Sequence, residues 1–228
     1  MNIKQILLFN RSRPDFDRIY VFGAGGSGRE TAWLISQIWD GAVEVVFVVD
    51  DPGYLKDLVN GFPVVLMPEI EGPLHSRYIV ALGDSAKRKA ISEKFDTAGH
   101  KAAILLHPRI EASPWVDVDT GSIVCANSTI TCNVIIGKHV QINVGSSISH
   151  DVTVGDYTTI SPRVTVCGNV RIGRGVFIGA NSCIINGRPE TPLLIGDGAV
   201  IAASACVTTN VSPGALVAGV PAIEKRTG

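Results

Sequence analysis

The chain has 228 residues, of which 46% are hydrophobic and 18% are charged, and its formal net charge at pH 7 is -1. This length fits one large domain or two small ones. A chain this neutral lacks the basic field that binds a phosphate backbone, and it is too apolar for a disordered tail. Its apolar runs fall far short of the roughly 20 residues of a membrane span. We therefore expect no nucleic-acid partner, no membrane association and a cytoplasmic protein.

Charged residues divide the chain into two parts. They make up 25 of the first 105 residues and 16 of the remaining 123. The change falls near His107-Pro108, where the X-Pro step favours an extended joint. We predict an N-terminal extension over residues 1–18, a first domain over residues 19–106 and a second domain over residues 107–228.

The first domain alternates strands and helices. The predicted strands are residues 19–22, 44–49 and 78–82, and the predicted helices are residues 29–39 and 84–95, the second with Asp84 as its N-cap. A strand, a turn, a helix and another strand indicate a βαβ unit. The first domain is therefore expected to be α/β with a parallel sheet.

A glycine loop, Gly23-x-Gly25-x-x-Gly28, lies between the first strand and the first helix. Asp50 follows the last glycine by 22 residues, which matches the dinucleotide fingerprint. The domain is short for the two halves that bind NAD. Glycines still let backbone amides at a helix start approach an anion, so we predict a cradle for a phosphate or a sugar nucleotide. A purely structural turn and an NAD site are the alternatives.

A six-residue period governs the second domain. In steps of six, Ile or Val occupies twelve consecutive positions from Val118 to Ile184, and after five extra residues the period resumes at Ile195. Such a hexapeptide repeat is typical of a parallel β-helix, in which three short strands complete a coil of 18 residues and the aliphatic residue points inward. Residues 186–194, which contain two prolines, are expected to form a loop.

Several motifs resemble known enzymes. The repeats end in Ile-Gly or Val-Gly pairs and close with Ala-Gly-Val-Pro-Ala at residues 218–222. They resemble the hexapeptide acyltransferases, whose domain is an all-β left-handed parallel β-helix. With the glycine loop, Asp50-Asp51 and the Ala-Leu-Gly-Asp segment at residues 81–84, the chain from about Ile19 to Ala222 is similar to bacterial sugar acetyltransferases of the NeuD and PglD type. The resemblance implies an N-terminal Rossmann-like domain that binds a nucleotide-linked amino sugar, a β-helix that binds acetyl-CoA, and a homotrimer.

The resemblance also implies substrate-binding residues. Gly23 and Gly25 would cradle the nucleotide sugar, Ser27 would lie beside its diphosphate, and Asp50 and Asp51 would face the uracil or ribose. Asn143 matches a family position on the β-helix. Members of the UDP-sugar branch often carry His where this chain has Ser27, so the nucleotide stays open.

His150 and Asp151 are the candidate catalytic pair. Acetyl transfer from a thioester requires the nucleophile to lose a proton, and an imidazole with an ordinary pKa near 6.5 suits that task at neutral pH. A surface histidine at a coil corner is the alternative, but the family's His-Glu or His-Asp pair falls at this repeat. Asp151 can orient His150 only if the turn bends the chain, because neighbouring side chains on a strand point oppositely.

Gly168 follows His150 by 18 residues, which is one coil. By resemblance its amide would stabilise the oxyanion of the tetrahedral intermediate, although turn geometry alone can also require a glycine. The resemblance further implies that Ala180, one coil further on, flanks the pantetheine arm of acetyl-CoA and that Gly219 approaches the adenine end. No metal is expected, because His139 lies 11 residues from His150, which is not a whole coil.

The leading hypothesis is an acetyl-CoA-dependent N-acetyltransferase that acts on a nucleotide-linked amino sugar for a surface glycan. O-acetylation of a sugar such as sialic acid is the first alternative. A non-catalytic trimeric β-helix module is the second, and the presence of His150 argues against it.

Overall fold

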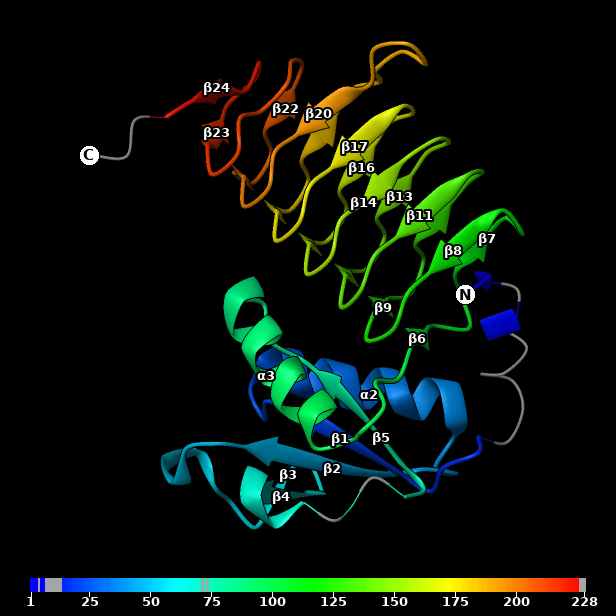
Figure 1. Cartoon of the computed structure of the whole chain (residues 1–228), viewed down its shortest axis with the longest axis vertical. Coiled ribbons are helices and arrows are strands. Elements are labelled where there is room, and N and C mark those ends of the chain that lie inside the picture. The colour runs from blue at the N-terminus through cyan, green and yellow to red at the C-terminus, as the bar shows by residue number, and fades with distance from the viewer. Residues whose placement is uncertain (4, 7–13, 71, 73, 226–228) are drawn as a thin grey trace.

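The computed structural model describes residues 1–3, 5–6, 14–70, 72 and 74–225. Within these residues a small α/β domain packs against the side of a parallel β-helix, next to its first coils (Figure 1). The α/β domain contains β1 (Arg18–Phe22), α2 (Gly26–Trp39), β2 (Glu44–Val49), β3 (Leu58–Val59), β4 (Phe62–Leu66), β5 (Ser76–Val80), α3 (Ser85–Thr97) and two single-turn 3-10 helices, Pro52–Tyr54 and Met67–Glu69.

The five-stranded sheet has the order β3-β4-β2-β1-β5. Strands β4, β2, β1 and β5 are parallel and β3 is an antiparallel edge strand. Alternate residues of β1 face opposite sides, so that Val21 packs with the α2 side and Phe22 with the α3 side. A parallel sheet with a helix on each face buries both sides of its strands, which confirms the predicted α/β domain.

The helix starts differ slightly from the prediction. α2 begins at Gly26, inside the glycine loop and three residues before the predicted start, whereas Asp84 caps α3 as predicted and accepts a hydrogen bond from Lys87 N at 2.9 Å. Gly28 packs tightly on the preceding turn, since a Cβ atom there would lie 1.8 Å from the carbonyl oxygen of Gly23. The third glycine of the loop is therefore required for the close approach of helix and strand.

The β-helix has three faces, each a parallel sheet apart from the terminal antiparallel pair β23 and β24. The first face contains β7 (Glu111–Ala112), β10 (Thr129–Ile130), β13 (Ser147–Ile148), β16 (Thr165–Val166), β19 (Cys183–Ile184) and β22 (Cys206–Val207). The second face contains β8 (Val116–Val118), β11 (Val134–Ile136), β14 (Thr153–Val154), β17 (Val170–Ile172) and β20 (Leu193–Ile195). The third face contains β6 (Leu105–Leu106), β9 (Ile123–Val124), β12 (Gln141–Ile142), β15 (Thr159–Ile160), β18 (Phe177–Ile178), β21 (Val200–Ile201), β23 (Leu216–Ala218) and β24 (Ile223–Glu224).

The predicted period is confirmed along the β-helix. The twelve aliphatic positions from Val118 to Ile184 all lie in its core and are at most 3% exposed. Each repeat has a second inward position, four residues after the aliphatic one, and buried serines there form local hydrogen bonds. Ser122 Oγ, for example, donates to Gly137 O at 2.8 Å. At the corners, residues with positive φ recur every six residues from Gly121 to Asn181. Each short strand thus ends in a residue that bends the chain toward the next face.

Three details of the β-helix depart from the predicted boundaries. Its first strand, β6, lies before residue 107, and Leu193 and Leu194 belong to β20, so the loop spans residues 186–192. At its start the chain contacts the first coils, because Met1 N donates to Val118 O at 3.0 Å and Ile3 is buried in the β-helix core. No helix in the described ranges is long and apolar enough to cross a membrane.

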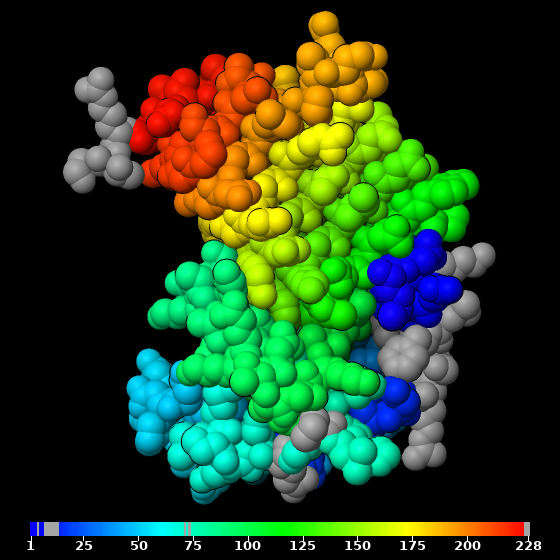
Figure 2. Space-filling model, in the orientation of Figure 1, coloured from blue at the N-terminus to red at the C-terminus, as the bar shows by residue number. Residues whose placement is uncertain are grey.

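The α/β domain docks on the third face. Arg88 of α3 is fully buried, and its guanidinium donates to Leu82 O and Gly83 O of its own domain. The same group donates to His139 O at 2.9 Å and to Tyr157 O, both on the β-helix. Figure 2 shows the α3 region packed directly on these coils. These bonds fix how the two domains face each other.

Candidate active site

His150 and Asp151 lie at the corner between β13 and β14, on the edge that joins the first and second faces. Asp151 has a φ of 58°, so the chain bends there and the two adjacent side chains meet. His150 Nδ1 lies 2.8 Å from Asp151 Oδ2, and Asn133 Nδ2 donates to Asp151 Oδ1 at 3.0 Å. The hydrogen bonds from His150 and Asn133 lower the pKa of Asp151.

This geometry defines the tautomer of His150. An ionised carboxylate can only accept, so Nδ1 carries the proton that binds Asp151 and Nε2 is left with its lone pair. The pair therefore has the arrangement of a general base with an orienting carboxylate. Sequence analysis missed Asn133, although its distance of 18 residues from Asp151 places it exactly one coil below.

Gly168 lies against the imidazole of His150. A Cβ atom at Gly168 would come within 2.5 Å of His150 Cε1, so no larger residue fits beside this ring. Within the described residues the N–H of Gly168 donates to no acceptor, whereas the next residue, Asn169, donates to His150 O at 3.1 Å. A free backbone donor thus lies directly beside the candidate base.

A cleft of about 800 Å³ opens at the carboxyl end of the parallel strands. Gly23, Gly25 and Asp50, the residues proposed for a nucleotide cradle, line this cleft. Four cationic side chains that sequence analysis missed also line the cleft: Arg29, Lys56, Lys87 and Lys94. With one carboxylate among four cations, the cleft is suited to a diphosphate. The seven-residue spacing of the two α3 lysines was the available signal, since it places them on one helix face.

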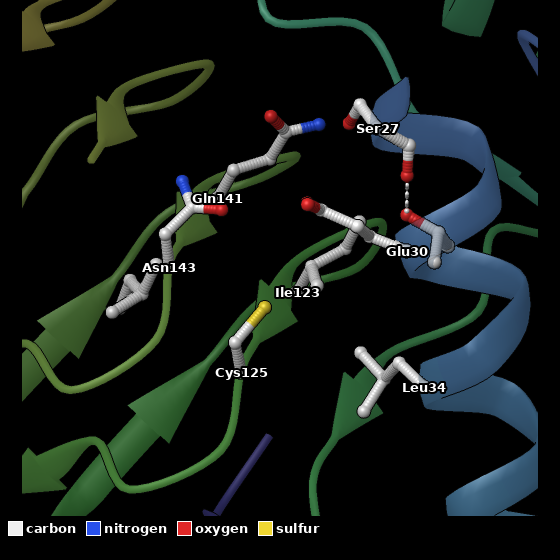
Figure 3. Close-up of a pocket in the computed structure, with 9 residues that line it drawn as sticks. Ser27, Glu30, Leu34, Ile123, Cys125, Gln141 and Asn143 are labelled. Atoms are coloured by element: carbon white, nitrogen blue, oxygen red, sulfur yellow. Dashed lines mark hydrogen bonds between the residues drawn. The ribbon is translucent and has the colours of Figure 1, made fainter. Parts of the chain in front are cut away.

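Two predicted nucleotide contacts lie elsewhere. Asp51 does not line the cleft; its Oδ1 accepts a hydrogen bond from Gly53 N at 2.8 Å and caps the 3-10 helix Pro52–Tyr54. Ser27 faces the β-helix rather than the cleft, and it lines a smaller pocket together with Asn143 (Figure 3). The first turn of α2 lies between the two pockets.

The predicted β-helix residues lie on two different edges. His150, Asp151 and Gly168 share the edge between the first and second faces, whereas Asn143 and Ala180 lie on the edge between the third and first faces. The prediction that Ala180 lies one coil beyond Gly168 was wrong about its place. Gly187 occupies that position and donates from its N to Gly168 O at 3.0 Å.

Gly219 closes the β-helix at the opposite end from the α/β domain. It follows β23 with a φ of 100°, far along the chain from the catalytic corner. Its place at the last coil is compatible with contact to the far end of an extended cofactor. No other predicted site residue lies nearby in sequence.

One chain does not bring the cleft and the base together. The α/β domain packs on the third face, where Gln141 Nε2 donates to Val80 O at 3.1 Å. His150 lies on the edge opposite that face, because it joins the other two. Nucleotide-binding groups and the catalytic pair of the same chain therefore face different directions.

His139 has a structural environment. It is 2% exposed, and its ring stacks on Tyr157 with centroids 5.2 Å apart. Burial lowers the pKa of His139 to about 4, so the ring is neutral at pH 7. In the described part of the chain, no group of three or more His, Cys, Asp or Glu side chains is arranged to hold a metal ion.

Comparison with known proteins gives matches in both domains. Residues 18–95 match the model of the PglD N-terminal domain, and residues 133–168 and 154–186 match that of the bacterial transferase hexapeptide with six repeats. GDP-perosamine N-acetyltransferase of Escherichia coli O157:H7 is 33% identical over 211 residues, which cover 90% of this chain and 95% of that protein.

Solved structures give the same picture. The acetyltransferase domain of PglB from Neisseria gonorrhoeae FA1090 is 30% identical with a TM-score of 0.82, over 91% of this chain and 99% of that one. PerB from Caulobacter crescentus in complex with CoA and GDP-perosamine is 25% identical with a TM-score of 0.80, over 91% of this chain and 97% of that one. These similarities extend through both domains.

Proposed function

Because the chain belongs to the family of bacterial sugar acetyltransferases with hexapeptide repeats, we propose that it transfers the acetyl group of acetyl-CoA to the amine of a nucleotide-linked amino sugar. The observation that carries the proposal is the hydrogen-bonded pair of His150 and Asp151 beside Gly168, in a chain that also has a cationic nucleotide cleft. Both domains support the assignment to the sugar acetyltransferases, because each of them matches a family model.

The catalytic corner supplies each element of the transfer. Nε2 of His150 takes the proton as the sugar amine attacks the thioester carbonyl, and Asp151 stabilises the imidazolium that forms. The N–H of Gly168 donates to the oxyanion of the tetrahedral intermediate. Collapse of the intermediate breaks the carbon–sulfur bond and releases CoA. Support for acetyl-CoA as the donor comes from the Neisseria gonorrhoeae domain, whose structure was solved in complex with acetyl coenzyme A.

GDP-perosamine is the first substrate to test. The Escherichia coli relative is named for it and the Caulobacter crescentus structure contains it. In this chain the glycine loop and the four cations of the cleft would bind the diphosphate, and Asp50 would face the nucleoside. Asp51 would support that contact indirectly, through the 3-10 helix that it caps. The sugar would extend past Ser27 toward Asn143.

N-acetylation is favoured over O-acetylation. The N-acetyltransferase relative is aligned over 90% of the chain, whereas the galactoside O-acetyltransferase of Escherichia coli K12 is aligned over 39%. The similarity to the O-acetyltransferase therefore extends over less than half of the chain. Both proposed substrates, acetyl-CoA and a nucleotide sugar, are metabolites of the cytoplasm, where we place the reaction.

A homotrimer would complete the active site. Since the cleft and His150 of one chain face different directions, the base that serves a given cleft belongs to a neighbouring subunit. The edge with Asn143 and Ala180 of one copy would then meet the edge with His150 and Gly168 of the next. Acetyl-CoA would lie between these edges, with its pantetheine arm at Ala180 and its adenine end toward Gly219.

An acetylation assay tests the proposed function. Acetyl-CoA is incubated with GDP-perosamine, with UDP-linked amino sugars and with free amino sugars, and products are identified by mass. We expect acetylation of a nucleotide-linked amine at the expense of acetyl-CoA, and no reaction with the free sugars, which lack the diphosphate. Acetylation of a hydroxyl group alone would contradict the proposed acceptor.

A further inference from the structure

The smaller pocket lies between the first turn of α2 and the third face of the β-helix. Its polar lining consists of Ser27, Glu30, Thr31, Gln141 and Asn143. In Figure 3 the Glu30 side chain extends from α2 toward the strands that carry Gln141 and Asn143. Gly25 and Arg29, from the same end of α2, line the large cleft. The first turn of α2 therefore separates the pocket from the cleft, and a ligand in the cleft would extend past this turn to reach the pocket.

The amide groups of this pocket are fixed with their oxygens available. Asn143 Nδ2 donates to Ile160 O at 2.9 Å, and Gln141 Nε2 donates to Val80 O at 3.1 Å. These bonds to carbonyl acceptors define which end of each amide is nitrogen. Within the described residues neither side-chain oxygen accepts a hydrogen bond. Both amides line the pocket with oxygens that have no donor in the described part of the chain.

Glu30 adds a negative charge to these acceptors. Its side chain is exposed, and it forms no ion pair or hydrogen bond within the part of the chain that the structure describes. The cations of the large cleft, Arg29 among them, lie on the other side of the helical turn. The pocket thus combines a carboxylate with amide oxygens and contains no cationic side chain, which is the opposite of the cleft.

We propose that Glu30, with Asn143, binds the amino group of the sugar as an ammonium ion and so selects an amino sugar over its hydroxyl counterpart. An ammonium group has only donors, and the pocket offers mainly acceptors. The pocket has room for about one water-sized group, which a single ammonium group matches. This inference rests on the proposed function and assigns to Glu30 the distinction between an amine and a hydroxyl group on the acceptor sugar.

The proposed binding is compatible with transfer. The ammonium ion first releases one proton to solvent, which gives the neutral amine that attacks the thioester. The second proton passes to His150 as the carbon–nitrogen bond forms. Because Glu30 is exposed rather than buried, its attraction to the ammonium ion is moderate and does not hold the amine in its protonated form.

Calorimetric binding without acetyl-CoA tests the inference. Wild-type protein is titrated with GDP-perosamine and with the analogue that has a hydroxyl group in place of the amine. We expect wild-type protein to prefer the amine, and Glu30→Gln to bind it about three- to fivefold more weakly with unchanged affinity for the hydroxyl analogue, since an exposed ion pair contributes up to about 1 kcal/mol. Glu30→Asp, which keeps the charge, should retain part of the preference.

Controls separate this inference from the proposed function. Glu93→Gln removes an exposed carboxylate from α3, away from both pockets, and should bind both ligands like wild-type protein. Unchanged melting temperature and an unchanged KM for acetyl-CoA show that Glu30→Gln is folded. Equal weakening of both ligands, or no weakening, would overturn the role of Glu30. If wild-type protein binds neither ligand, the proposed GDP-sugar substrate is wrong, and the inference fails with it.

Discussion

At the catalytic corner, the hydrogen bonds of Asp151 determine what His150 can do. Asn133 and His150 both donate to this carboxylate, which keeps it ionised and keeps the proton of the imidazole on Nδ1. We expect His150→Ala to lower kcat by roughly 10²–10⁴-fold, the usual contribution of a positioned general base. Steady-state kinetics, with acetyl-CoA affinity measured separately as the control, will check this. A variant that turns over at the wild-type rate would exclude His150 as the base.

Gly168 allows a sharper test of the same corner. A methyl group at this position would lie 2.5 Å from the imidazole and would displace it, while the backbone of Gly168 has no positive φ to be strained. We expect Gly168→Ala to lower kcat on the order of 10²-fold, since a displacement of about 1 Å can have this effect. The melting temperature should change little. Gly72→Ala is the control for general glycine effects, because a Cβ atom there meets nothing within 4 Å and the residue lines neither pocket.

The buried His139 is expected to make the free energy of unfolding depend on pH. Burial lowers its pKa to about 4, below the ordinary 6.5 of the unfolded chain, so the unfolded state binds a proton first as the pH falls. The neutral ring stabilises the fold fully above pH 6.5, and this contribution, about 3 kcal/mol, is lost between pH 6.5 and pH 4.

Melting temperatures of wild-type protein and His139→Asn between pH 7 and pH 4 will check this. Asparagine suits the positive φ of 52° at this corner, so the variant should retain the turn. Its pH dependence should be weaker than that of wild-type protein. It should not vanish, because burial also lowers the pKa of His100 and His107. Identical slopes for both proteins would contradict the buried neutral state of His139.

Among the elements, α3 carries the bonds that join the two domains. Arg88 satisfies carbonyl groups of both domains, and burial lowers its pKa only to about 10, so it remains charged at pH 7. Arg88→Met would leave these buried carbonyls without donors. We expect a loss of about 3–5 kcal/mol in the free energy of unfolding, since each unsatisfied buried group costs about 1–3 kcal/mol.

Urea denaturation of Arg88→Met and Arg88→Lys will measure this. Lysine keeps the charge but has three donors on a compact group, so its variant should lie between methionine and wild type. Lys89→Met is the matched control on the next residue, because the Lys89 side chain is exposed and, among the residues that the structure describes, forms a single surface ion pair with Glu93 at 3.9 Å. It should cost less than about 1 kcal/mol. Similar losses at both positions would show that Arg88 has no special role.

Local and periodic features could be predicted from the sequence. The six-residue period located the strands of the β-helix, and Asp84 located the start of α3, because both signals lie within a few residues of what they determine. The sequence could not show whether Asp151 contacts His150, since that contact depends on a backbone bend at the corner. Arg88 and Glu30 gave no signal at all. Arg88 bonds His139 O, 51 residues away on the β-helix, and Glu30 shares a pocket with Gln141 and Asn143, so only the docking of the two domains brings these groups together.

At the scale of the whole molecule, the placement of the domains determines where the active site can form. The α/β domain covers the third face, and the catalytic pair lies on the opposite edge. Under the proposed function, a cleft in one subunit would be served by His150 of another. A closed ring of three copies gives every cleft one such neighbour.

Mixed trimers test this arrangement directly. His150→Ala subunits keep an intact cleft, and subunits with Lys87→Ala and Lys94→Ala keep an intact base, so each variant alone should be nearly inactive. When the two are coexpressed, each trimer that contains both variants should pair an intact cleft with an intact neighbouring base at about a third of its junctions, whichever variant supplies two of the subunits, because the ring is closed. We expect activity near this fraction of the wild-type value, measured on trimers purified through a different tag on each variant. If cleft and base of one chain worked together, no junction in a mixed trimer would be complete, and the mixture would stay as inactive as its components.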